Sequence, residues 1–225
     1  MKHFQRVSLS LVALYFVSPR CVPQAPIQNA QSAKGQIGIR VYNDARVPDA
    51  RLQAAEEVAA RVLRQAGIEA KWSDCTVIGG QVRNDPPSCA VPLRFRDMVV
   101  YFVDRLEAHF PWVSQNALGY SIIPDTCEFA SMAYISYTRI QRLSDTTSAG
   151  TKDLLGLAIA HEIGHLLFGS NEHANRGLMR ATWRLRDLEA KAWGEFEFSP
   201  EQGKKLRAGV EARKKGDELG AAAQR

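Results

Sequence analysis

The chain has 225 residues, of which 45% are hydrophobic and 24% charged, and this composition excludes a disordered or low-complexity protein and fits one globular domain. No stretch of about 18 apolar residues occurs, which excludes a multi-span membrane protein. The net charge of +5 arises at the ends, with +3 in residues 1–33 and +3 in residues 201–225, so the body carries −1 and a nucleic-acid partner is not expected.

Residues 1–25 have the pattern of an export signal. A positive stretch with Lys2 and Arg6 precedes an apolar run of 11 residues, Val7–Val17, which suits a signal peptide and is too short to span a membrane. No clear cleavage site follows, and residues 26–36 have the polar composition of a linker. We therefore expect a secreted or periplasmic protein with no stable membrane span after signal removal. The alternative is a buried N-terminal helix.

Export would place the four cysteines in an oxidising compartment, where disulfides persist. Cys75 and Cys89 flank a turn-rich loop, and a bond between them would stabilise the fold by about 3 kcal/mol. The alternative is a set of reduced thiols in a cytosolic chain, and the sequence leaves the choice open.

The body of the chain alternates between strand and helix patterns. Period-two alternation and β-branched runs predict strands, at 36–42, 68–72, 96–103, 118–123 (a short edge strand) and 131–138. Apolar residues at helical spacing predict helices, at 48–67, 151–168, 182–193 and 199–215. Asp49 is the expected N-cap of the first helix, and Gly67 and Gly169 are expected to end the first two. This order indicates an α+β fold with one twisted mixed sheet and helices packed on it.

The chemistry is concentrated in residues 161–165, which read His-Glu-Ile-Gly-His. His161 and His165 are four apart on a predicted helix, so both imidazoles leave one face, as two ligands of one zinc ion do. Glu162 follows about 100° round the helix and can hydrogen-bond a water on the metal. The flanking residues are mostly apolar, and burial of these three polar groups without a partner would be costly. The pattern therefore favours a zinc site over two hydrogen-bonded core histidines.

A catalytic zinc ion has three protein ligands and one open position. His173, eight residues after His165, is the expected third ligand, because imidazole binds zinc better than the amide of Asn171 and is preferred to the carboxylate of Glu172. Six residues after His173 stands Met179.

In this segment the sequence resembles the metzincin superfamily of zinc peptidases, whose signature is HExxHxxGxxH followed by a methionine turn. The resemblance covers residues 161–179 and is partial, because Phe168 and Asn171 stand where the family has its glycine and third histidine. It implies the same turn with the third ligand moved to His173 and with Met179 in the methionine turn. The segment HEIGHLLFGSNEHANRGLMRATW also resembles a group of secreted bacterial proteins that share this variant signature.

The resemblance implies an exported zinc metallopeptidase that acts on a peptide or protein. Its zincin-like catalytic domain would span residues 37–198, followed by a C-terminal helix and basic tail at 199–225. Zn2+ on the three histidines would activate a water, and Glu162 would be the general base. One edge strand, 118–123 or 131–138, would pair with the extended substrate.

Two alternatives stay open. In a gluzincin pattern the third ligand would be Glu189, 24 residues after His165 on a predicted helix. In the other, the chain is a non-catalytic extracytoplasmic module that binds zinc or a partner without hydrolysis. Glu162 favours an enzyme, because a structural zinc site closes its fourth position with a ligand and does not use a base.

Overall fold

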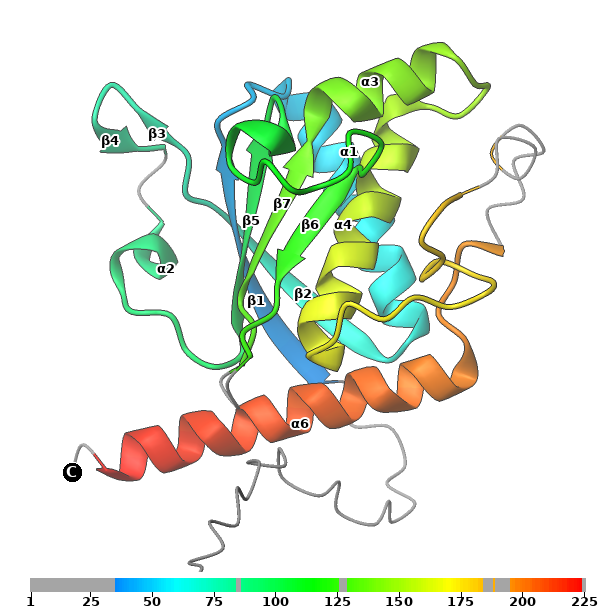
Figure 1. Cartoon of the computed structure of the whole chain (residues 1–225). Coiled ribbons are helices and arrows are strands. Elements are labelled where there is room, and N and C mark those ends of the chain that lie inside the picture. The colour runs from blue at the N-terminus through cyan, green and yellow to red at the C-terminus, as the bar shows by residue number, and fades with distance from the viewer. Residues whose placement is uncertain (1–34, 84–85, 126–128, 184–187, 189–194, 224–225) are drawn as a thin grey trace, which may run out of the picture.

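A computed structural model describes residues 35–83, 86–125, 129–183, 188 and 195–223 (Figure 1). The expected export signal lies outside these residues, as do nearly all of the expected linker and most of the predicted helix 182–193. None of the helices that the structure describes has both the length and the apolar character that a membrane crossing requires.

A five-stranded mixed sheet lies at the centre of the fold, in the order β2-β1-β5-β7-β6 (Figure 1). The four parallel strands are β1 (Gly35–Asn43), β2 (Ile68–Asp74), β5 (Asp97–Val103) and β7 (Met132–Ser136). The short strand β6 (Gly119–Ile122) pairs antiparallel with β7 and forms one edge of the sheet. The predicted α+β class with one mixed sheet and C-terminal helices is confirmed.

The predicted strand 131–138 is wrong at its C-terminal end. β7 stops at Ser136, and Tyr137 begins helix α3 (Tyr137–Asp145), which the sequence analysis did not predict. Tyr137 and Ile140 are both buried, and their spacing of three is helical. β7 also lies between β5 and β6, so it cannot be the edge strand that pairs with a substrate.

Helices α1 (Asp49–Gln65) and α4 (Thr151–Phe168) pack against each other on one face of the sheet (Figure 1). Their backbones approach closely at Gly156, where a Cβ would lie 2.5 Å from Cβ of Val58. The apolar side chains of both helices and of the inner sheet face form one core.

The ends of these helices follow the predictions in part. Gly67 and Gly169 have φ angles of 83° and 63° and end α1 and α4 as expected. Asp49 is not the N-cap of α1, because Pro48 occupies that position. The Asp49 carboxylate pairs instead with the guanidinium of Arg83.

The opposite face of the sheet carries a row of aromatic side chains. Tyr42, Tyr101 and Tyr134, from β1, β5 and β7, stack with ring centroids 4.9 Å apart. The connection from β5 to β6 contains the 3-10 helix η1 (Leu106–Ala108) and adds Phe110, 4.8 Å from Tyr134.

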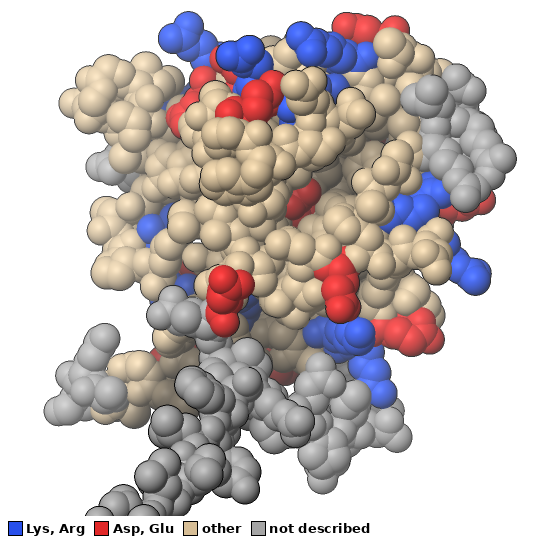
Figure 2. All heavy atoms as spheres, in the orientation of Figure 1, with Lys and Arg blue, Asp and Glu red and all other residues tan. Residues whose placement is uncertain are grey.

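In the view of Figure 2, charged side chains gather mainly along the upper rim and at the lower right, and the centre is largely uncharged.

Helix α6 (Pro200–Ala223) extends beyond the predicted helix 199–215 and packs against α4 and β1 (Figure 1). A capping box begins it, because the hydroxyl of Ser199 accepts the N–H of Gln202 at 3.2 Å and the Gln202 amide oxygen accepts the N–H of Ser199 at 2.8 Å.

The buried Arg213 joins α6 to the rest of the fold. Its guanidinium donates hydrogen bonds to the backbone oxygens of Phe95, Ala130 and Leu166, at 2.8, 2.6 and 2.7 Å. Phe95 and Ala130 precede β5 and β7, and Leu166 lies in the last turn of α4. One side chain therefore holds three elements together.

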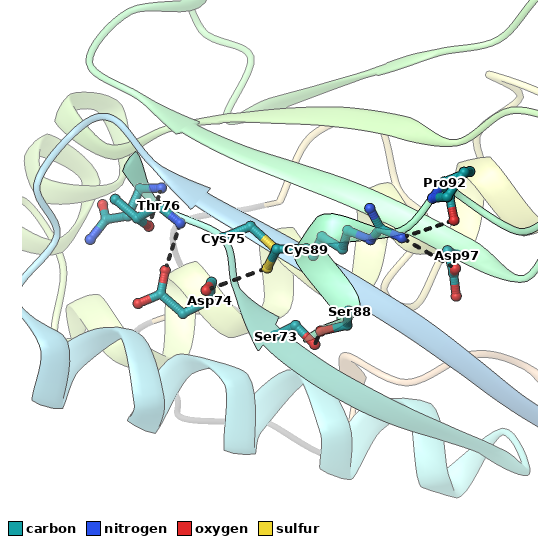
Figure 3. The surroundings of a disulfide bond; sticks show 10 residues. Ser73, Asp74, Cys75, Thr76, Ser88, Cys89, Pro92 and Asp97 are labelled. Carbon is teal, nitrogen blue, oxygen red and sulfur yellow. Dashed lines mark hydrogen bonds and ion pairs between the residues drawn. A yellow bond between two sulfur atoms is a disulfide. The ribbon is translucent and has the colours of Figure 1, made fainter. Parts of the chain in front are cut away.

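Cys75 and Cys89 form a disulfide, with their Cα atoms 5.6 Å apart (Figure 3). The bond closes a loop that contains the hairpin strands β3 (Val77–Ile78) and β4 (Gln81–Val82) and ends within helix α2 (Pro87–Ala90). The structure thus settles the pairing that the sequence left open.

Removal of this bond is expected to destabilise the chain without affecting metal binding, because the loop contains none of the candidate ligands. Replacement of Cys75 and Cys89 together by alanine should lower the free energy of unfolding by about 3 kcal/mol in a denaturant titration. Reductant should destabilise the unsubstituted chain to a similar extent and leave the double variant unchanged. Equal stability of both proteins would contradict this expectation.

Candidate metal centre

Helix α4 is enclosed by the rest of the fold. Thirteen consecutive residues from Leu155 to Leu167 are buried, on all sides of the helix, between α1, the sheet and α6. His161, Glu162 and His165 are 8%, 5% and 3% exposed, so three ionisable groups lie inside an apolar environment. Groups of this kind are rarely buried unless they have partners.

The two histidines of α4 are held by the loop that follows the helix. Nδ1 of His161 lies 2.8 Å from the carbonyl oxygen of Leu178, and Nδ1 of His165 lies 2.8 Å from that of Ser170. A carbonyl oxygen only accepts hydrogen bonds, so each Nδ1 carries the ring hydrogen. In a neutral imidazole, Nε2 then presents a lone pair.

The two Nε2 atoms lie 3.0 Å apart. With both hydrogens on Nδ1, two lone pairs face each other without a proton between them, an arrangement that a bound cation stabilises. Two nitrogens on one tetrahedral zinc ion, at about 2.0–2.1 Å from it, lie about 3.4 Å apart. The observed spacing is close to that value.

The structure brings His173 to the same point. Its ring centroid lies 5.5 Å from that of His161 and 4.8 Å from that of His165. Candidate ligand nitrogens of all three residues lie within 4.8 Å of one another. His173 is exposed and the other two are buried, so the cluster is open to solvent on the side of His173.

The loop that carries His173 folds back toward α4. Gly169 starts the reversal, and the N–H of Ala174 donates to the carbonyl of Met179 at 2.7 Å, which closes the loop. Asn171 and Glu172, which lie between these points, are exposed and are not part of the histidine cluster. Glu189, the ligand of the gluzincin alternative, lies outside the described residues.

Burial keeps the three imidazoles neutral at physiological pH. It lowers the pKa of His161 to about 3, with a further contribution from the neighbouring His165, and lowers that of His165 to about 4. Partial desolvation lowers the pKa of His173 as well. Neutral imidazole is the form that binds a metal ion, so the cluster is ready to bind one.

Met179 packs against α4 at Gly164. It is buried, and a Cβ on Gly164 would lie 2.8 Å from its sulfur, so the thioether packs directly on the helix backbone. The glycine of the His-Glu-Ile-Gly-His motif therefore makes room for the methionine.

The side chain of Glu162 contacts strand β6. Its carboxylate oxygen Oε2 accepts a hydrogen bond of 2.7 Å from the hydroxyl of Ser121. Burial raises the pKa of Glu162 to about 7, and the bond from Ser121 opposes this shift.

Two contacts of this centre were not predicted from the sequence. One is the bond from Ser121, and the other comes from Trp183, whose indole N–H donates to the carbonyl of Leu178 at 3.1 Å, the same oxygen that holds His161. The bond from Ser121 could have been inferred from the small residues Gly119 and Ser121, which stand at alternate positions of a predicted edge strand. The contact of Trp183 with Leu178 depends on how the loop folds, and no pattern in the sequence indicates it.

The comparisons with known proteins give a distant structural similarity. No protein-family model matches the chain. No curated protein matches it either. The structure is similar to archaemetzincin from Methanopyrus kandleri, with a TM-score of 0.48 and 16% identity over 81% of this chain and 99% of that one. It is also similar to metalloproteinase-II from Bacteroides fragilis, with a TM-score of 0.43 and 14% identity over 78% of this chain and 55% of that one. Similarity at this level does not establish a shared activity, so the chemistry has to be derived from the side chains.

We expect the purified chain to bind close to one zinc ion, and a His173→Ala variant to lose most of it. The matched control is Glu172→Gln, one residue earlier in the same exposed loop, which should retain the metal. Elemental analysis measures the content. Thermal unfolding should show zinc stabilising the unsubstituted chain by about 2.7 kcal/mol at a free concentration of 100 times Kd. Full zinc content in the His173→Ala chain would remove this residue from the centre.

Proposed function

We propose that the chain is a zinc-dependent metallopeptidase that holds zinc with His161, His165 and His173 and hydrolyses peptide bonds. The set of three candidate metal ligands is the observation on which this proposal depends. Three neutral imidazoles converge, and no fourth histidine, cysteine, aspartate or glutamate of the described residues joins them. Structural zinc sites use four protein ligands, whereas three ligands and an open position are the pattern of a catalytic site.

Glu162 acts as the general base in this proposal. A zinc ion in the site would supply a Lewis acid and lower the pKa of a bound water. The carboxylate of Glu162 takes the proton of the attacking water and then delivers it to the amine of the departing peptide. Burial raises the pKa of Glu162, which favours uptake of the proton, and the residue must then donate it within the same reaction cycle.

Strand β6 is the proposed docking strand for the substrate. It forms the edge of the sheet and packs against α4, and only one of its sides pairs with another strand. An extended peptide can add to such an edge through backbone hydrogen bonds, so that its chain runs past the histidine cluster. The substrate class that fits is therefore an extended segment of a peptide or protein.

We also propose that the chain is exported, with residues 1–25 as its signal and residues 37–198 as the catalytic domain. The disulfide between Cys75 and Cys89 supports this proposal, since such bonds persist mainly in oxidising compartments. Mass spectrometry of the protein recovered outside the cytoplasm should find a mature N-terminus near residue 25. Recovery of the chain only in the cytoplasm, with Met1 retained, would contradict export.

Replacement of Glu162 by glutamine tests the enzymatic proposal. The variant should keep its zinc, because Glu162 is not in the ligand cluster, and should lose about 10²–10⁴-fold in kcat, because the base is gone. Cleavage of unfolded casein and of a quenched-fluorescence peptide mixture measures the rate. The exposed Glu172→Gln variant is the matched control and should remain active. Unchanged cleavage by the Glu162→Gln chain would refute the mechanism.

A further inference from the structure

Strand β6 presents two side-chain positions to Glu162. Gly119 and Ser121 are two residues apart, so both face α4, and Tyr120 between them faces the aromatic row on the other side of the sheet. Ser121 is buried, and its hydroxyl lies 2.7 Å from Oε2 of Glu162 and 3.0 Å from the backbone oxygen of the same residue. A hydroxyl has one proton, and the carboxylate is the stronger acceptor at the shorter distance.

Gly119 provides the space that the carboxylate occupies. A Cβ at this position would lie 2.5 Å from Oε1, 2.6 Å from Cγ and 2.7 Å from Cδ of Glu162. Any side chain on residue 119 would therefore displace the Glu162 side chain.

We propose that Ser121 and Gly119 are positioning residues, which fix the carboxylate of Glu162 in the orientation that its work as a base requires. This inference rests on the proposed function. It assigns a second role to β6, since the strand whose free edge would pair with the substrate also holds the base. The position of the peptide and the position of the proton acceptor are then set by the same four residues, Gly119–Ile122.

The geometry explains why a serine is suited to this position. A hydrogen-bond donor gives a buried carboxylate a preferred orientation, and loss of the donor leaves the carboxylate free to turn. An outer-shell group of this kind commonly contributes about 10–100-fold to activity. The contribution should appear in kcat, because the side chain of Ser121 is buried against Glu162 and any pairing of β6 with the substrate would use only its backbone.

The test compares Ser121→Ala with Ser136→Ala in the zinc-loaded full chain. Ser136 is a matched control, because it is a buried serine on the adjacent strand β7 whose hydroxyl donates to the backbone oxygen of Asp104 at 2.8 Å, away from Glu162. Both variants should lose some stability and keep their zinc. Only Ser121→Ala should lose about 10–100-fold in kcat with KM nearly unchanged. Gly119→Ala should lose kcat as well, because its methyl group displaces the carboxylate.

A measurement without substrate separates this proposal from the proposed function. Thermal unfolding of metal-free Ser121→Ala, Glu162→Gln and the double variant forms a double-mutant cycle. Coupled changes support the Ser121–Glu162 contact even if no substrate is cleaved, in which case only the proposed function fails. Additive changes, or a Ser121→Ala chain with full kcat where Glu162→Gln is inactive, would overturn the positioning role and leave the proposed function standing.

Discussion

Two hydrogen bonds from imidazole to backbone carbonyl organise this centre. His161 and His165 each give their Nδ1 hydrogen to a carbonyl of the loop that follows α4, at Leu178 and Ser170, and their Nε2 lone pairs are thereby directed at one another. If either ring turned, it would lose this hydrogen bond. The folded loop therefore determines both the tautomer and the direction of the ligands, and the third imidazole enters on the same loop. The histidine cluster is consequently a property of a helix and a loop together.

The position of α4 in the fold gives this arrangement its rigidity. The helix is apolar on every side because α1, the sheet and α6 surround it, and the polar groups of residues 161–165 are the exception within it. The two histidines bond to the loop that follows the helix, and Glu162 bonds to β6. The proposed base and the proposed ligands are therefore fixed by different elements although they are neighbours in the sequence.

The sequence contained enough information to predict the helix that carries the motif, its end at Gly169, and most strands, because these depend on local spacing and on one conformationally special residue. It also indicated His173 as the third ligand, because imidazole is a better zinc ligand than the side chains of Asn171 and Glu172 in the same short loop. The contacts of Ser121 with Glu162 and of Leu178 with His161 join residues 41 and 17 positions apart, and no local pattern encodes them. Strand 131–138 was predicted too long for a related reason, since period-two alternation continues by chance into α3. Only the burial of Tyr137 and Ile140 reveals the helical period.

The buried Arg213 has a consequence for the order in which the centre can form. The carbonyl of Leu166, in the turn between His165 and the end of α4, receives its donor from a residue 47 positions later in the chain. While the chain is being synthesised, this carbonyl lacks its donor until Arg213, in the second half of α6, has been added, and an unpaired buried carbonyl is unfavourable. A nascent chain that already contains the complete His-Glu-Ile-Gly-His motif therefore lacks one hydrogen bond of the turn beside His165. The end of the helix that carries the motif depends on a residue of the C-terminal helix.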